Sequence, residues 1–155
     1  MKRTLTLFLA GISMVSATLA PTHFSAFSFA AIVVAPQPDC LPYEPAEVTL
    51  TGSVSIKTFP GPPNYTSIKE GDKPEQAWIL RLAKPICVKA DKQDEVNLAV
   101  DHVSLIQLVL RDKQFSQVRT LNKRGPVTLT GTLFHSITAH HHAKVLMWVT
   151  DIRGQ

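Results

Sequence analysis

Val48-Thr49-Leu50-Thr51-Gly52-Ser53-Val54 and its echo, Val127-Thr128-Leu129-Thr130-Gly131-Thr132-Leu133, decide the fold of this chain. In both stretches aliphatic residues alternate with hydroxyl-bearing residues, so at the two-residue period of a strand one face is apolar. Each stretch also carries a glycine at the same phase, and a glycine inside a strand marks a bend or bulge where a sheet curls. The echo occurs once, which argues against a solenoid. The two stretches predict two half-buried strands of a curled sheet, over 48–56 and 127–137.

Three further apolar runs predict the remaining strands, at 77–82 with a continuation at 85–88, at 103–110 and at 144–150. The run at 103–110 also fits a short helix, and we favour the strand. Phe115, Val118 and Leu121 recur at helical spacing within 112–122, which predicts one or two helical turns after the third strand. Five strands, two of them kinked by glycine, and a short helix match a small all-β, OB-like five-stranded barrel. An open β-sandwich is the alternative.

The first thirty residues have the pattern of a signal peptide. Lys2 and Arg3 precede an apolar run, and no acidic residue occurs before Asp39. Ser28-Phe29-Ala30 offers small residues where a signal peptidase cuts. A transmembrane anchor is the alternative, but Pro21 interrupts the run short of the ~20 apolar residues that a span needs. The pattern predicts a signal peptide over 1–30 and a periplasmic or secreted protein.

A mature chain that starts at Ala31 would have 125 residues, enough for one modest core. Four prolines within 31–45 indicate an extended arm, and 46–153 would form the single β domain. Cys40 and Cys87 are the two cysteines, and an even count in an exported chain predicts one disulfide bond. A thiolate metal site would need clustered ligands, which this spacing does not provide.

Charge and motifs exclude several functions. The net charge of +4 falls to +2 once Lys2 and Arg3 are removed, and the longest basic cluster is Lys123-Arg124. Nucleic acid is therefore not expected as a partner, because phosphate backbones are bound by concentrated basic patches. The chain contains no G-x-S-x-G, H-E-x-x-H or P-loop motif, so we expect a protein that is not an enzyme.

Four of the six histidines lie within eight residues: His135, His140, His141 and His142. Imidazole binds zinc and copper, and three nitrogen ligands suffice for a site. His135 is in phase with Leu133, which is expected to face inward. In an extended segment His140 and His142 lie on one face, and His141 lies on the opposite face. These phases make His135, His140 and His142 the candidate zinc or copper ligands. The alternatives are solvent-exposed histidines at a hairpin tip, or contacts to a ligand or partner that would include His141.

A proline-rich loop follows the first strand, Phe59-Pro60-Gly61-Pro62-Pro63-Asn64-Tyr65. Prolines stiffen such a loop and its rings offer apolar faces, so little ordering entropy would be lost on binding. Phe59, Pro62, Asn64 and Tyr65 are therefore the candidate contact residues. The alternative is a structural loop that closes one end of the barrel.

Two motifs together resemble a family of short exported bacterial proteins described as a domain of unknown function. The first is the proline-rich loop through Gly71-Asp72-Lys73-Pro74-Glu75, and the second runs from Gly131-Thr132-Leu133-Phe134-His135 to His140-His141-His142. The resemblance covers about 40–152 and implies export and the extent of the domain. Relatives that accompany lysozyme-inhibitor-like modules imply a protein-binding role in the cell envelope.

We therefore expect a monomeric, non-enzymatic binding module whose partner is an unknown envelope protein or a small ligand. Zinc or copper binding through 135–142 is one alternative, and a hydrolase is another.

Overall fold

The computed structural model describes residues 40–154. The predicted signal peptide, 1–30, and most of the predicted arm lie outside the described residues. The elements, in chain order, are β1 (Glu47–Pro60), the 3₁₀ helix η1 (Ile68–Glu70), β2 (Pro74–Val88), β3 (Val100–Val109), α1 (Asp112–Asn122), β4 (Val127–His135) and β5 (Val145–Gly154).

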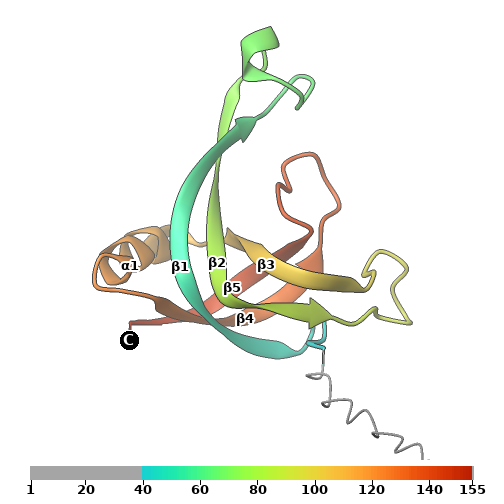
Figure 1. The fold of residues 1–155 in the computed structure, drawn as a ribbon, viewed down its shortest axis with the longest axis vertical. Coiled ribbons are helices and arrows are strands. Elements are labelled where there is room, and N and C mark those ends of the chain that lie inside the picture. The colour runs from blue at the N-terminus through green and yellow to red at the C-terminus, as the bar shows by residue number, and fades with distance from the viewer. Residues whose placement is uncertain (1–39, 155) are drawn as a thin grey trace, which may run out of the picture. The chain divides into compact units, whose positions relative to one another are not determined.

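The five strands close into a barrel in the order β1-β2-β3-β5-β4 (Figure 1). Neighbouring strands are antiparallel, apart from the parallel pair β3 and β5. The helix α1 lies between β3 and β4 in the chain, as the sequence predicts, and has 11 residues. The OB-like five-stranded barrel is thus confirmed over the open sandwich.

The two echoing stretches pair with each other. β1 and β4 run antiparallel with Leu50 opposite Leu129, so the aliphatic residues of both strands face the interior together. On the outer face Thr49 meets Thr130, with 3.1 Å between their hydroxyl oxygens, and Thr51 meets Thr128 at 2.9 Å. Such cross-strand pairs stabilise a sheet, which explains why the two strands repeat one pattern.

The glycines of the echo lie where the backbones of neighbouring strands come closest. Gly52 pairs with Val127 of β4 and with Leu82 of β2, so β1 changes partner at this residue. A Cβ atom on Gly52 would overlap the carbonyl oxygen of Arg81, and one on Gly131 would overlap that of Trp148. Only glycine allows these approaches without a backbone shift.

The core fills the barrel with aliphatic side chains from every strand and from α1. Its largest fully buried members are Leu80, Ile106, Leu129, Leu133, Met147, Val88, Val118, Val127 and Val145, while Ile79 and Leu146 are fully buried outside this cluster. Asn122, at the end of α1, accepts a hydrogen bond from Val54 N and donates one to Val54 O, at 2.9 and 2.7 Å. This amide thereby attaches the helix to β1. Within residues 40–154, no helix is long and apolar enough to cross a membrane.

Cys40 and Cys87 form the predicted disulfide bond, with 4.7 Å between their Cα atoms. The bond joins the segment before β1 to the end of β2. Leu41 continues this contact, because its N–H donates to Cys87 O and its carbonyl accepts from Lys89 N. Tyr43 then places its side chain in the core, where it is only 3% exposed.

The hairpin of β1 and β2 extends beyond the closed part of the barrel (Figure 1). After Gly52, β1 pairs with β2 alone, as far as Pro60 opposite Pro74. The sequence places the end of the strand earlier, because prolines interrupt sheets. Here the outer edge of β1 has no neighbouring strand, so a proline without an N–H group is tolerated there. The extension carries the proline-rich loop away from the core.

Candidate functional site

The two loops singled out in the sequence lie side by side. We call 61–73, between β1 and β2, the tip loop, and 136–144, between β4 and β5, the histidine loop. In Figure 1 the histidine loop rises beside the extended hairpin. The Nε2 atom of His140 lies 3.0 Å from the hydroxyl of Tyr65, and its Nδ1 atom lies 2.9 Å from both carboxylate oxygens of Glu75. These contacts join residues that are 65 and 75 positions apart.

His142 makes the second contact between the histidine loop and the hairpin. Its ring stacks on Phe59, with centroids 4.2 Å apart and planes 3° from parallel. Its Nε2 atom lies 3.6 Å from Glu75 Oε1, too far for a hydrogen bond. This nitrogen is buried and has no hydrogen-bond partner among the described residues. Glu75 therefore lies between two imidazoles, of which one is hydrogen-bonded to it and the other is not.

Gln107 of β3 holds the histidine loop at its backbone. The side-chain N–H of Gln107 donates to the carbonyl of His140 at 3.0 Å, and its Oε1 accepts from the N–H of His142 at 2.6 Å. One amide thus holds the backbone on both sides of His141. Through this amide, β3 positions the loop so that the imidazoles of His140 and His142 face the β1–β2 hairpin.

Asp72 organises the tip loop. Its side chain accepts hydrogen bonds from the N–H groups of Asn64, Thr66 and Ser67 at 2.8, 2.7 and 2.8 Å. Within this frame Tyr65 has φ 58°, in the left-handed region that residues other than glycine rarely adopt. Such backbone strain persists where the surroundings impose it, and it clusters at functional sites. The backbone of the tip loop therefore fixes the position from which the ring of Tyr65 contacts His140.

The hydrogen bonds that order the tip loop are predicted to depend on pH through the carboxylate of Asp72. Hydrogen bonds from the N–H groups of Ser67, Thr66 and Asn64 lower its pKa from 3.8 to about 2. A lowered pKa means that the stabilising bonds are complete above pH 3.8 and are lost as the pH falls through about 2. NMR titration of these three amide protons should show a midpoint near 2, and a midpoint near 3.8 would contradict the role.

Substitution separates this effect from general acid unfolding. Asp72→Asn should shift the amide signals of 64–67 at neutral pH, because the amide group cannot accept the same bonds with both of its atoms. Asp91→Asn is the matched control, since the side chain of Asp91 accepts a single N–H bond in another loop, from Gln93. This control should leave the tip loop unchanged.

The other histidines of the predicted metal site lie elsewhere. His135 ends β4, and its Nδ1 atom lies 3.0 Å from the carbonyl of Ser136, while its ring meets the edge of Tyr43. The structure therefore does not bring His135 together with His140 and His142. His141 accepts a hydrogen bond from Ile137 N. Burial, together with the charges of His140 and His142, lowers the pKa of His141.

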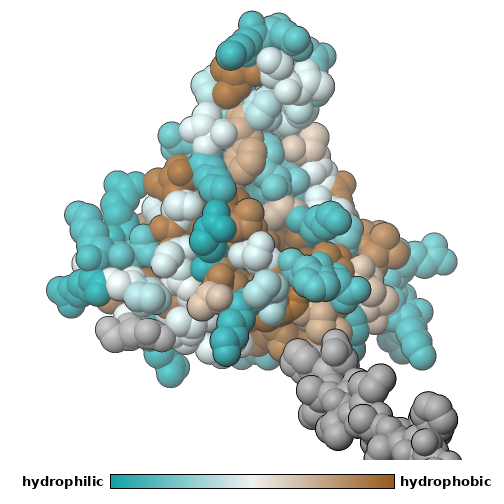
Figure 2. Space-filling view, viewed as in Figure 1, coloured by the Kyte–Doolittle hydropathy of each residue, from teal (hydrophilic) through white to brown (hydrophobic). Residues whose placement is uncertain are grey.

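The four predicted contact residues of the proline-rich loop divide between the strand and its tip. Phe59 is still paired in β1, opposite Glu75. The carbonyl of Pro62 accepts from Lys73 N, and Asn64 binds Asp72 through its backbone, so both help to shape the tip loop. At the end of this hairpin hydrophobic and hydrophilic residues lie next to one another (Figure 2).

Three residues of the site were not predicted: Asp72, Glu75 and Gln107. Glu75 pairs with Phe59 only because β1 continues through the prolines, and the sequence indicates an earlier end. Gln107 gives a clearer signal, since it is an isolated amide in the apolar run 103–110. Asp72 follows Gly71 in a loop, which is typical of turns in general and does not single it out.

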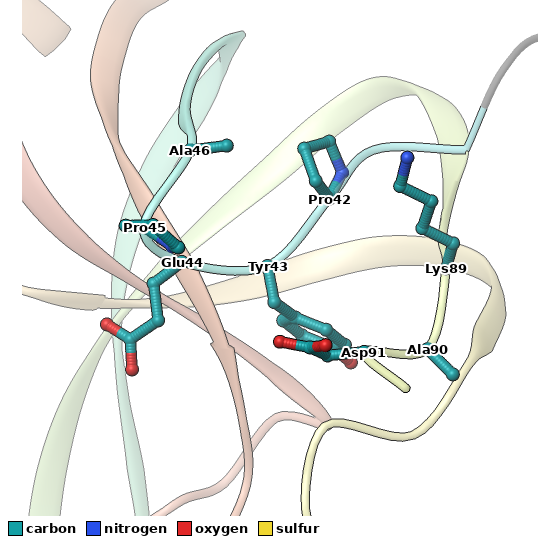
Figure 3. Close-up of a pocket in the computed structure, with 8 residues that line it drawn as sticks. All are labelled: Pro42, Tyr43, Glu44, Pro45, Ala46, Lys89, Ala90 and Asp91. Atoms are coloured by element: carbon teal, nitrogen blue, oxygen red, sulfur yellow. The ribbon is translucent and has the colours of Figure 1, made fainter. Parts of the chain in front are cut away.

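A separate pocket of about 360 Å³ lies where the segment before β1 meets the end of β2. Figure 3 shows the side chains that line it, with Glu44 and Lys89 on opposite sides. Tyr43 contributes its ring and donates its hydroxyl to Leu98 O at 2.8 Å, and burial raises its pKa to about 12. Because its charged groups do not converge on one point, this pocket is the weaker candidate.

Comparison with known proteins found a similarity to one family model over part of the chain. Residues 105–153 match the family model described as Domain of unknown function (DUF4431). The expected resemblance to a domain of unknown function is thus confirmed over a segment that includes the histidine loop but not the proline-rich loop. No curated protein and no solved structure matches the chain.

Proposed function

We propose that this protein is an exported, non-enzymatic binding module, and that it binds a protein of the cell envelope. The binding face would consist of the tip loop, the histidine loop and the start of β2 between them. One observation carries the proposal: Tyr65, Glu75 and His140 hold together two loops that are far apart in the sequence. A face that is ordered before binding loses little entropy when a partner arrives.

The position of this face in the fold supports the proposal by analogy. OB-folds bind their ligands with the loop between strands 1 and 2, the loop between strands 4 and 5, and the face of strands 2 and 3. Here the tip loop and the histidine loop occupy those two connections, and Glu75 and Gln107 come from β2 and β3. Folds host many functions, so the analogy supports the location and not the nature of the partner.

Photo-crosslinking tests the proposed face. A photoreactive residue in place of Tyr65 should give a discrete adduct with one envelope protein in the native cell. The matched control is the same residue in place of Phe115, another partly exposed ring, which lies on α1. An adduct from Tyr65 alone supports the face. No adduct from Tyr65, or the same adducts from both positions, would refute it.

Export is proposed from the charged and apolar N-terminus and is consistent with the disulfide bond. Intact-mass measurement of protein from the native host should give a chain that starts near Ala31 and carries the Cys40–Cys87 bond. A chain that retains Met1, or one with two free thiols, would contradict export.

The same contacts also bear on the hydrolase alternative. A hydroxyl, an imidazole and a carboxylate lie in series at Tyr65, His140 and Glu75, an arrangement that nucleophilic enzymes use. However, the side chain of His140 is 58% exposed. Such catalysis depends on a site that excludes water, so this geometry favours binding over hydrolysis.

A further inference from the structure

We infer that Glu75, His140 and His142 form a binding site for a divalent transition-metal ion, zinc or copper, within the proposed binding face. The inference deepens the proposed function, because it adds a ligand to the same face. The carboxylate of Glu75 is the group that both imidazoles approach, at 2.9 Å from His140 Nδ1 and 3.6 Å from His142 Nε2.

The unpaired nitrogen of His142 points to a ligand. The side chain of His142 is 9% exposed, and its Nε2 atom has no hydrogen-bond partner among residues 40–154. A buried polar atom without a partner costs free energy, and a metal ion bound at this atom would remove that cost. The ring is already oriented by Phe59 on its face and by Gln107 at its backbone.

The chemistry of the donors selects the class of metal. Two imidazoles and one carboxylate suit zinc and copper, whereas calcium and magnesium prefer oxygen ligands alone. Three protein ligands leave one coordination position of zinc for water or for a side chain of a partner. Copper(II) should bind more tightly than zinc, as divalent ions of this row generally do at such sites.

Neighbouring groups provide the outer contacts that metal ligands need. If His140 binds through Nδ1, its Nε2–H donates to the hydroxyl of Tyr65, which lies 3.0 Å away. Gln107 holds the backbone of both histidines on β3. His142 also borders a surface hollow of about 270 Å³ with His102 and Lys144.

The ligand atoms of the proposed site would have to move closer together to surround an ion. Among residues 40–154, the group whose three potential ligand atoms already lie within 4.8 Å of one another is Cys40, Cys87 and Asp101, and its two sulfur atoms form the disulfide. In the proposed site His140 has room to turn, because its side chain is exposed. The inference thus keeps two ligands of the sequence-based set and replaces His135 with Glu75.

Metal titration of the untagged protein, residues 31–155, tests the inference. Zn²⁺ and Cu²⁺ should each bind with one ion per chain and a dissociation constant below about 1 μM. His142→Ala and Glu75→Gln should each weaken binding by at least about tenfold, while His135→Ala and His141→Ala should leave it unchanged. Glu75→Gln preserves the size of the side chain, so it remains informative if His142→Ala unfolds the loop.

The outcomes separate this inference from the proposed function. Wild-type binding weaker than about 1 μM, or equal losses in all four variants, would overturn the metal site, because equal losses indicate a flexible cluster. The photo-crosslink at Tyr65 is therefore repeated with purified, metal-depleted protein added to envelope proteins of the native host. An adduct that persists without any metal affinity would leave the binding face standing and remove only the metal.

Discussion

Loss of the Cys40–Cys87 bond should lower the free energy of unfolding by about 4 kcal/mol, because the crosslink restricts the unfolded chain. The two cysteines are 47 residues apart, so the closed loop is long. It contains the whole of β1 and almost all of β2. Without the bond the unfolded chain gains the conformations that the loop excludes, while the barrel itself keeps its contacts.

Urea unfolding of the oxidised protein, the reduced protein and the double variant Cys40→Ser/Cys87→Ser measures this effect. The reduced protein and the variant should agree, since both remove the same crosslink. A difference below about 1 kcal/mol from the oxidised protein would contradict the prediction. In that case the hydrogen bonds of Leu41 with Cys87 and Lys89 would suffice to hold the segment before β1.

Strand phases were predictable because they depend on local pattern. Alternation in the echoing stretches gave the inward and outward faces of β1 and β4, and the hydroxyl pairs on the outer face follow from it. The apolar run 103–110 was harder, since a continuous run fits a strand or a helix. Its assignment to β3 is confirmed, with Val103 and Ile106 buried.

The sequence singles out both loops as candidate binding segments, but it does not predict that they lie next to each other. Phase alone separates His141 from His140 and His142, and in the structure His141 meets Phe134 while the other two face the hairpin. The hairpin residues that contact these two histidines are Phe59, Tyr65 and Glu75. They are within reach because β1 extends beyond the barrel. No local pattern encodes this length, because the free edge that tolerates Pro60 exists only in the closed topology.

The same limit applies to His135. Its inward phase was predicted from the alternation of β4, and its ring meets the edge of the Tyr43 ring. The step from there to a shared metal site assumed that a hairpin turn at 138–143 would place His135 opposite His140 or His142. The connection instead spans 136–144, His135 pairs with Val145, and Gln107 of β3 holds the backbone of His140 and His142.

Tyr43→Ala should lower the free energy of unfolding by about 3 to 5 kcal/mol, the cost of truncating a large buried aromatic side chain. Tyr43 lies in a proline-rich segment that reads as an extended arm, yet it belongs to the core and is 3% exposed. Tyr43→Phe keeps the ring and loses one hydrogen bond to Leu98 O, so a loss of about 1 kcal/mol is expected.

Tyr65→Ala is the matched control at the proposed binding face. Tyr65 is a partly exposed tyrosine of the tip loop, so its truncation should change the stability by about 0.5 kcal/mol or less while weakening partner binding. Thermal or urea unfolding of the three variants compares them directly. If Tyr43→Ala cost no more than Tyr65→Ala, the Tyr43 ring would contribute nothing to the core, and a chain beginning at Ala46 would lose only the stability that the disulfide bond provides. If the predicted order holds, such a shortened chain loses both the disulfide and the Tyr43 ring, and the folding unit begins at Cys40.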